Sequence, residues 1–414
     1  MQQAASDLLD IYASAVAAVQ GTACVERCLA ARPWTGEAYV VAVGKAAAAM
    51  LEGAQIVLGT NVRAALLITK PGHMTPGATR NARVVAMEAG HPLPDQRSLD
   101  AGAALLTFIA KAPPGAPLLF LLSGGASSLV EVLPPGVSLA DLRRVNAWLL
   151  GSGLAIHAMN ALRKRLSCIK GGRLATYLQA RPVVQLLISD VPGDAPAAIG
   201  SGLLAPPSVT DDPAMDLPVW LRVLLNKTPP LPPADADCFN AVETHIIANL
   251  DQAMTAAARV ATRRGYAIHV HDEHLRGDAA VQGRRLAGDL LRGPAGVHIW
   301  GGETTVVLPP RPGRGGRNQH LALAAAMILA GHDKVWLLAA GTDGNDGGGE
   351  DAGALVDGGT LARGELAELD AADCLRRADA GTLLEASGDL ISTGPTGTNV
   401  MDLVIGLKEH PVRR

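Results

Sequence analysis

The stretch YVVAVGKAAAAM, residues 39–50, joins a short apolar run to an alanine-rich segment through Gly44 and Lys45. A continuous apolar run closed by glycine is typical of a strand buried on both faces, and such strands form mainly parallel sheets. The alanine-rich segment that follows predicts a helix. This stretch therefore predicts one strand–loop–helix unit of an α/β fold.

The same pattern recurs at four other places in the chain. In each of them an apolar run ends in glycine, serine or carboxylate residues. We therefore expect an α/β protein with a mainly parallel sheet, whose ligands bind where the strands end. The four segments are LLFLLSGGASSLV (118–130), VVQLLISDVPGD (183–194), VHIWGGETTVVL (297–308) and LAAGTDGNDGGGEDAGALVDGGT (338–360).

Composition limits the classes of function. The chain has 414 residues, of which 48% are hydrophobic and 18% charged, which suits two globular domains. A formal charge of −3 without charged blocks gives no electrostatic case for nucleic acid or an anionic membrane. Prolines and acidic residues concentrate in 206–237, which favours a boundary between domains at 1–236 and 237–414. Site loops occur on both sides of this boundary, so we expect the active site in the cleft between the domains.

The compartment is predicted from the cysteines and from the N-terminus. The five cysteines are scattered and odd in number, which fits a reducing cytoplasm rather than a disulfide framework. The first residues, MQQAASDLLDIYASAVAAV, carry two aspartates and no basic segment, so we expect an amphipathic helix and no signal peptide. The longest uncharged stretch, 112–130, is interrupted by prolines and glycines and is too broken to span a bilayer.

Carboxylates and glycines dominate the segment 338–360. Glycine lets the backbone approach a ligand closely, and hard cations such as Mg²⁺ prefer carboxylate oxygens and are bound together with phosphates. We therefore expect a loop with a divalent-metal site in which Asp343 or Asp351 lies within one water of the ion. An ordinary acidic surface turn is the alternative. The carboxylates are Asp343, Asp346, Glu350, Asp351 and Asp357.

Three charged residues at predicted element ends are candidates for chemistry. Lys45 is one of only eight lysines and lies between a strand and a helix, where an ammonium group suits phosphate. Asp190 closes a strand and is either a base for a substrate hydroxyl or a helix cap. Arg317 follows Arg311 and Arg314 on a glycine-rich loop before an apolar helix, where guanidinium groups clamp phosphate or carboxylate, unless the loop is simply solvated.

Several motifs are absent from the sequence or too weak to use. No G-x-x-x-x-G-K-[ST] occurs, and no G-x-G-x-x-G follows a strand, so neither a Walker A site nor a dinucleotide fingerprint is expected. The histidines His269 and His271 alternate as the exposed face of a strand does, and no further ligand is spaced for zinc.

Taken in order, eleven segments resemble the glycerate 2-kinase family, whose C-terminal half is called the MOFRL domain. The resemblance covers nearly the whole chain, from about residue 5 to 407. The segments are VAVGKAA, KPGH, EAGHPLPDQRSLDAG, LLSGGASSL, NALRKRLSCIKGGRLA, LLISDVPGD, GSGLLAPP, GGETTV, GRGGRNQHLAL, AAGTDGNDG and TGPTGTNVMDL.

This resemblance implies a Rossmann-like α/β/α domain followed by a mixed-sheet α/β domain, and an enzyme that uses ATP and a divalent cation such as Mg²⁺ to phosphorylate D-glycerate at its 2-hydroxyl. It places the family's essential lysine, aspartate and arginine on Lys45, Asp190 and Arg317. The alanine beside Asn249 departs from the family's pattern. The resemblance does not decide whether the chain forms a homodimer. Residues expected to contact glycerate or nucleotide are Gly44, Ser123, Gly124, Gly125, Ser189, Asn249, Gly302, Glu303, Thr342 and Asn399.

Two other functions remain as alternatives. Bacterial members of the family carry an older label as hydroxypyruvate reductases, but a reductase needs a nicotinamide site and no fingerprint supports one. A regulator that binds a phosphosugar without catalysis would not need several carboxylates together with a lysine and an arginine. Phosphoryl transfer, which depends on positioning and charge neutralisation, accounts for all of these residues.

Overall fold

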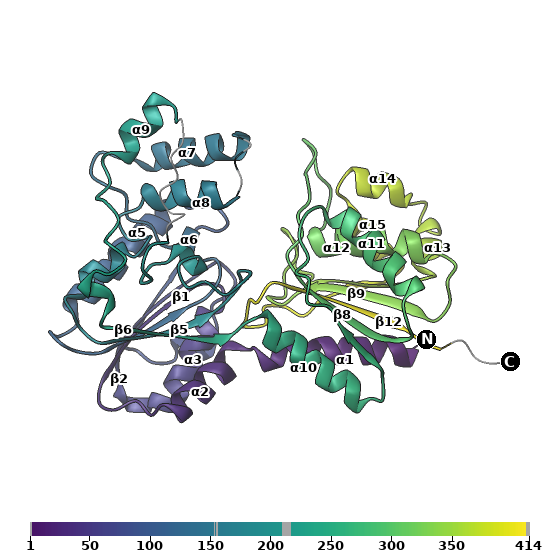
Figure 1. Ribbon diagram of the computed structural model, residues 1–414, viewed down its shortest axis with the longest axis horizontal. Coiled ribbons are helices and arrows are strands. Elements are labelled where there is room, and N and C mark those ends of the chain that lie inside the picture. Colours follow the sequence, from purple (N-terminus) through teal and green to yellow (C-terminus); the bar gives the residue numbers. More distant parts are fainter. Residues whose placement is uncertain (1, 153, 155, 209–216, 411–414) are drawn as a thin grey trace. The chain divides into compact units, whose positions relative to one another are not determined.

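The chain forms two compact units, which are described here one at a time (Figure 1). The structure is a computed structural model and describes residues 2–152, 154, 156–208 and 217–410. The N-terminal unit is Gly21–Ile247, and the C-terminal unit combines Met1–Gln20 with Ala248–Arg414.

This division differs from the boundary predicted between residues 236 and 237. Strand β6 (Val242–Ala248) follows the proline-rich segment and still belongs to the sheet of the N-terminal unit, beside β5 (Val183–Ile188). Helix α1 (Gln2–Ala18) belongs to the C-terminal unit, where Asp7 receives hydrogen bonds from Arg264 and from the Tyr266 hydroxyl. Prolines in a connection therefore did not mark where the sheets separate.

The N-terminal unit contains a six-stranded sheet of order β3-β2-β1-β4-β5-β6, in which the pairs from β3 to β5 are parallel. This confirms the predicted parallel sheet. Strand β4, LLFLL, is buried throughout, as its uninterrupted apolar sequence predicts. Strand β4 is Leu118–Leu122, and the strands not yet given bounds are β1 (Ala38–Val43), β2 (Val62–Thr69) and β3 (Val84–Glu88).

Helices cover both faces of this sheet (Figure 1). Apolar residues of β1, β2 and β4 pack against α5 and α6 in one core, and a second core holds α7, α8 and α9 together. The helices of this unit are α2 (Gly21–Ala31), α3 (Ala47–Leu58), α4 (Pro76–Thr79), α5 (Gln96–Lys111), α6 (Ala126–Leu129), α7 (Leu139–Gly151), α8 (Ile156–Arg165), α9 (Val219–Leu225), and the 3-10 turns η1 (Gly59–Asn61), η2 (Arg173–Leu178), η3 (Ile199–Ser201) and η5 (Asp237–Phe239).

The C-terminal unit contains a mixed sheet of order β11-β10-β9-β12-β8-β7, as the resemblance implied. Strands β7 and β8 pair in parallel, whereas β12 pairs antiparallel with both β8 and β9. Helices α1 and α10 lie on one side of this sheet, and α11 to α15 lie on the other (Figure 1). The elements are α10 (Leu250–Arg263), β7 (Ile268–Val270), α11 (Ala279–Arg292), β8 (Gly296–Gly302), α12 (Arg317–Leu329), β9 (Val335–Gly341), β10 (Gly353–Asp357), α13 (Thr360–Glu365), α14 (Ala371–Arg376), α15 (Ala380–Ser387), β11 (Leu390–Ile391) and β12 (Asp402–Lys408).

The predicted acidic loop is shorter than expected. Residues 353–357 form β10, which pairs antiparallel with β9, so that Asp357 lies opposite Trp336 at the far end of both strands. There Asp357 forms an ion pair with Arg363 at 3.0 Å. The sequence GALVD is short and lies inside a glycine-rich segment, so it was predicted as part of the loop. Asp357 therefore does not belong with the other carboxylates of the segment.

In the part of the chain that the structure describes, no single helix is long and apolar enough to cross a membrane. The bent pair Gln3–Ala18 and Gly21–Ala31 reaches the limits of length and composition when taken together. Both helices bury apolar residues, among them Leu8 and Ile11 in the first and Val25 and Leu29 in the second.

Candidate active site

In the N-terminal unit, the loops after β1 and β4 are joined by backbone and side-chain hydrogen bonds. The Lys45 amide donates to the Gly124 carbonyl at 2.9 Å, and the Ala46 amide donates to the Ser123 hydroxyl at 3.0 Å. A Cβ atom on Gly44 would lie 2.2 Å from the Ser123 hydroxyl oxygen, so this approach requires glycine. The predicted residues of the Gly-Lys and Ser-Gly-Gly segments therefore lie together at the carboxyl edge of the sheet.

Gly125 makes room for two side chains. Its φ is +83°, and a Cβ atom there would lie 3.2 Å from Lys45 Cγ and 3.2 Å from the His91 ring. The half-buried Lys45 side chain thus passes beside the backbone of Gly125. A side chain at position 125 would therefore crowd the stem of Lys45.

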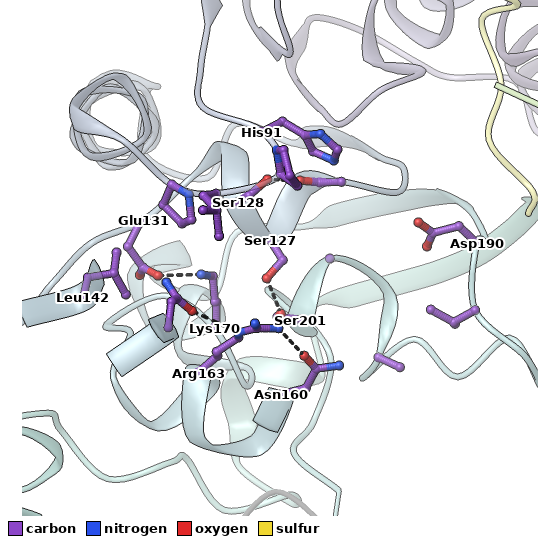
Figure 2. Close-up of a pocket in the computed structure, with 18 residues that line it drawn as sticks. His91, Ser127, Ser128, Glu131, Leu142, Asn160, Arg163, Lys170, Asp190 and Ser201 are labelled. Atoms are coloured by element: carbon purple, nitrogen blue, oxygen red, sulfur yellow. Dashed lines mark hydrogen bonds and ion pairs between the residues drawn. The ribbon is translucent and has the colours of Figure 1, made fainter. Parts of the chain in front are cut away.

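A cavity of about 280 Å³ opens at this edge of the same sheet (Figure 2). Gly125 lines it after β4, and Asp190 lines it two residues after β5. Figure 2 shows the Asp190 carboxylate directed toward the side on which Ser127 lies. Ser189, directly before Asp190, uses its hydroxyl to donate to the Val191 carbonyl at 3.3 Å, which holds the turn.

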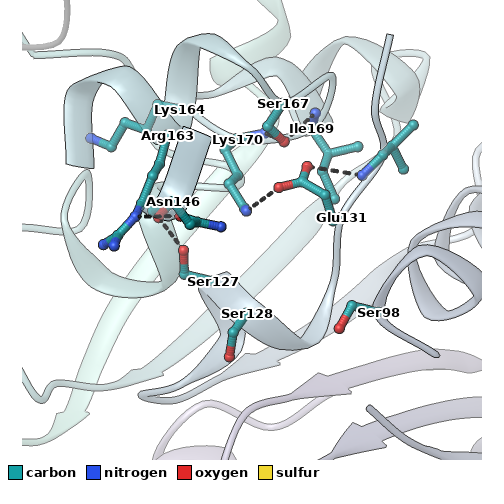
Figure 3. Close-up of polar contacts among 12 residues, drawn as sticks. Ser98, Ser127, Ser128, Glu131, Asn146, Arg163, Lys164, Ser167, Ile169 and Lys170 are labelled. Carbon is teal, nitrogen blue, oxygen red and sulfur yellow. Dashed lines mark hydrogen bonds and ion pairs between the residues drawn. The ribbon is translucent and has the colours of Figure 1, made fainter. Parts of the chain in front are cut away.

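The opposite part of this cavity carries a polar network that we did not predict (Figure 3). Lys170 Nζ lies 2.5 Å from Glu131 Oε2, and the two side chains are only 3% and 2% exposed. The Ser127 and Ser201 hydroxyls share a hydrogen bond of 2.7 Å. Arg163 extends from α8 into the same network. The cavity therefore combines one carboxylate at a strand end with two cations, of which one is neutralised.

In the C-terminal unit, Arg317 is surrounded by carboxylates. It is the first residue of α12, and its Nε and Nη2 donate to Asp402 Oδ2 at 2.5 Å and to Asp402 Oδ1 at 2.9 Å. Its Nη1 lies 2.9 Å from Glu303 Oε1. Burial lowers the pKa of the Arg317 guanidinium, but the neighbouring Asp402 and Glu303 outweigh it, so the pKa lies above its usual value. Arg317 is thus permanently charged and held in a fixed direction.

Asp346 is deeply buried at the start of the same helix. Its carboxylate accepts hydrogen bonds from the Asn318 amide at 3.0 Å and the Gln319 amide at 2.8 Å. Burial raises the pKa of Asp346 to about 7, against the lowering effect of these two amides. Asp346 therefore orients the N-terminus of α12, and with it Arg317.

Four of the other predicted contact residues have structural tasks in the C-terminal unit. The Thr342 hydroxyl donates to the Met401 carbonyl at 2.6 Å and accepts from the Val400 amide at 2.8 Å. The Asn249 side chain caps α10 by accepting from the Gln252 amide at 3.0 Å. Gly302 pairs with Asp402 in the sheet, and Asn399 is buried just before β12. The structure gathers Gly302, Glu303, Arg317 and Thr342 around the start of β12, whereas Asn249 lies at the start of a helix on the other face.

The two predicted metal residues differ in their surroundings. A Cβ atom on Gly341 would lie 3.2 Å from Asp343 Oδ1 and 3.4 Å from Asp402 Oδ1, so these two carboxylates flank one backbone position. Asp351 instead accepts a hydrogen bond from Ser392. Among the described residues no group of three or more histidine, cysteine, aspartate or glutamate side chains is placed to hold a metal ion. Mg²⁺ needs only one or two carboxylates when substrate phosphates complete its shell, and Asp343 with Asp402 fit that requirement.

The unpredicted residues lay within segments that already stood out in the sequence. Asp402 ends the segment TGPTGTNVMD, and Arg163 and Lys170 lie in NALRKRLSCIK. Both segments served only for the family resemblance, and no role was predicted for these three residues. Only contacts between distant positions, such as Glu131 with Lys170, distinguish the buried cations from the exposed ones.

Known protein families, relatives and solved structures match this chain over most of its length. Residues 7–228 match a family described as a domain of unknown function, DUF4147, and residues 296–402 match the MOFRL family. A D-glycerate 2-kinase of Thermotoga maritima is 38% identical over 89% of this chain and 90% of its own length. A protein of Agrobacterium vitis with a provisional name as a hydroxypyruvate reductase is also 38% identical, over 89% of this chain and 98% of its own. The crystal structure of a Thermotoga maritima glycerate kinase superposes with a TM-score of 0.84 at 33% identity, covering 99% of this chain and 100% of that one.

Proposed function

Because the chain belongs to the glycerate 2-kinase family, we propose that it transfers the γ-phosphoryl group of ATP to the 2-hydroxyl of D-glycerate. One structural observation supports the proposal. Lys45, Gly125 and Asp190 stand at the carboxyl ends of β1, β4 and β5, beside or within one polar cavity. A lysine, a glycine loop and a carboxylate at one sheet edge suit the transfer of a phosphoryl group to an alcohol, which depends on positioning and charge neutralisation.

In this proposal Asp190 accepts the proton of the attacking hydroxyl. Its half-buried carboxylate follows a strand end and faces the cavity, where an alcohol can approach it. Lys45 neutralises charge that develops on the phosphoryl oxygens. A compact ammonium on a long stem suits this task better than a planar guanidinium does.

Arg317 is proposed to bind the transferring phosphoryl group. Asp402 and Glu303 hold two sides of its guanidinium and fix its direction. Asp343 and Asp402 are the residues that would hold a divalent cation together with the nucleotide phosphates. Such an ion, when bound, neutralises phosphate charge and orients the phosphates for in-line attack.

Two assays distinguish a kinase from a reductase. The chain incubated with ATP, Mg²⁺ and D-glycerate should form ADP only when glycerate is present. Excess EDTA should abolish this activity, and full activity in EDTA would contradict the proposed metal requirement. With hydroxypyruvate, the chain should not oxidise NADH. If the chain oxidises NADH but forms no ADP in response to glycerate, the kinase assignment is wrong and the reductase assignment holds. These assays do not test the cytoplasmic location or the homodimer, which remain predictions.

A further inference from the structure

Arg163 lies in the cavity of the N-terminal unit without an acidic partner among the residues that the structure describes. Its Nε donates to Asn146 Oδ1 at 3.1 Å, and its Nη1 donates to Asn160 Oδ1 at 3.1 Å. Both acceptors are neutral amides. Nη2 makes no hydrogen bond to a described residue, while the side chain lines the cavity. One face of the guanidinium is therefore available to a ligand.

The neighbouring cation, Lys170, differs from Arg163 because it has a carboxylate partner. Lys170 lines the same cavity, but its charge is balanced by Glu131 at 2.5 Å. The charge of Arg163 is partly removed from water and not balanced by a described carboxylate, and burial accordingly lowers the pKa of its guanidinium. A partly buried charge that lacks a counter-ion is costly, and a bound anion removes that cost.

The protein holds this arginine in place. Asn146 stands on α7 and is buried, and Asn160 stands on α8. These two helices pack together through Val145, Leu149 and Leu162, which are fully buried. The two amides therefore orient the guanidinium before any ligand arrives, which lowers the entropic cost of binding.

We propose that Arg163 binds the carboxylate of the glycerate acceptor, so that the cavity recognises 2-hydroxy acids as a class. The inference rests on the proposed kinase function. Arg163 and Asp190 line different parts of one cavity of about 280 Å³, which suits a three-carbon acid (Figure 2). A carboxylate bound at Arg163 leaves the adjacent 2-hydroxyl directed toward the part of the cavity that Asp190 lines. A guanidinium pairs with a carboxylate through two parallel hydrogen bonds, which fixes orientation as well as position.

A nucleotide phosphate has the same charge chemistry as a carboxylate, so the test separates the two. We compare Arg163→Gln with the wild type and with Arg143→Gln, which removes an exposed charge from the neighbouring helix α7. Arg163→Gln should raise KM for D-glycerate by about 10- to 100-fold, the effect of one charge-assisted hydrogen-bonded pair. KM for ATP should stay within about twofold, and Arg143→Gln should match the wild type.

An uncharged acceptor gives a readout that a merely structural arginine would not change. The wild type should prefer D-glycerate to glyceramide, in which an amide replaces the carboxylate, and Arg163→Gln should lose about the same 10- to 100-fold preference. Arg163→Lys, which keeps the charge but not the planar fork, should fall between the two. All variants should first show a wild-type circular dichroism spectrum; if Arg163→Gln does not, Arg163→Lys carries the test.

Three results would overturn the inference. They are an unchanged KM for glycerate, an unchanged preference over glyceramide, and an increase confined to KM for ATP, which would assign Arg163 to the nucleotide. Calorimetric titration of D-glycerate separates this inference from the proposed function. If the wild type binds glycerate and Arg163→Gln binds it at least tenfold more weakly, Arg163 is the anchor even where no phosphoryl transfer is detected. If the wild type transfers phosphate and the variant binds glycerate equally well, only the inference fails.

Discussion

Arg163 in the N-terminal unit and Arg317 in the C-terminal unit are both partly buried arginines, but their partners differ. Asp402 and Glu303 pair with Arg317, whereas two neutral asparagines hold Arg163. The charge of Arg317 is therefore balanced by neighbouring carboxylates, whereas no described carboxylate balances the charge of Arg163. The comparison teaches that burial alone does not identify a ligand site: the proposed anion at Arg163 follows from the lack of a described carboxylate partner, whereas the proposed phosphoryl binding at Arg317 follows from the family resemblance.

The surroundings of the two arginines also carry charges of opposite sign. Asp343 and Asp402 flank Gly341, and Asp346 lies at the start of α12, so carboxylates outnumber cations around Arg317. Around Arg163 the Lys170–Glu131 pair is neutral and leaves one positive charge. We therefore assign metal-bound phosphates to the first environment and a substrate carboxylate to the second.

The largest effect is expected at Lys45, whose ammonium neither environment can replace. Lys45→Ala should lower kcat by about 10²- to 10⁴-fold, because it removes a preorganised charge that acts in the transition state. Lys45→Arg should not restore the rate, since the planar fork does not fit a point-charge site. Steady-state rates with saturating ATP and glycerate measure this effect, with Lys111→Ala, exposed at the end of α5, as the control. A Lys45→Ala enzyme near the wild-type rate would remove this residue from the mechanism.

Asp190→Asn tests whether the acceptor is activated within the cavity that contains Arg163. The substitution keeps the size of the side chain but removes proton acceptance, so kcat should fall by about 10²-fold or more while KM changes little. Asp100→Asn, on the exposed side of α5, is the matched control. A large rise of KM with normal kcat would instead make Asp190 a binding group.

Stability separates the two arginines directly. Arg317→Gln leaves Asp402 without its cation and should lower the free energy of unfolding by roughly 1–3 kcal/mol. Combining Arg317→Gln with Asp402→Asn should cost less than the sum of the single changes. Arg163→Gln should change stability by less than about 1 kcal/mol, because no carboxylate is left unpaired. Urea unfolding curves measure all four variants, and equal losses for the two arginine variants would remove the distinction between them.

The last effect is a dependence of the stability on pH at Asp346. Burial raises its pKa in the folded protein to about 7, from an ordinary value of 3.8. Between these two values the folded chain keeps a proton that the unfolded chain has released. The free energy of unfolding therefore falls as pH rises through this window, by at most about 1.4 kcal/mol per pH unit for one proton.

Asp346→Asn should remove this contribution, because the amide oxygen still accepts from the α12 backbone but does not titrate. Unfolding curves are measured for the wild type and the variant from pH 4.5 to 7.5. The free energy of unfolding of the wild type should fall relative to that of the variant as pH rises. A difference that stays constant with pH would show that Asp346 is ionised throughout.

Strand ends were predictable from the sequence, whereas charge balance was not. The apolar runs before Lys45, Gly124 and Asp190 end in glycine or polar residues, and that pattern depends only on neighbours in sequence. Strand β10 was not predicted because its five residues, which begin with glycine inside a glycine-rich segment, show too little periodicity. Arg163 could not be predicted because its partners Asn146 and Asn160 come from two helices, and because the lack of a carboxylate partner among the described residues is visible only in the folded structure.

The isomer of phosphoglycerate that forms tests the central claim most directly. The chain is incubated with ATP, Mg²⁺ and D-glycerate, and enolase is added as the only coupling enzyme, since enolase consumes 2-phosphoglycerate and ignores the 3-isomer. If Asp190 activates the 2-hydroxyl next to a carboxylate held by Arg163, phosphoenolpyruvate should appear as fast as ADP. ADP formation without phosphoenolpyruvate, restored when phosphoglycerate mutase is added, would show that the 3-hydroxyl is the acceptor and would contradict this account.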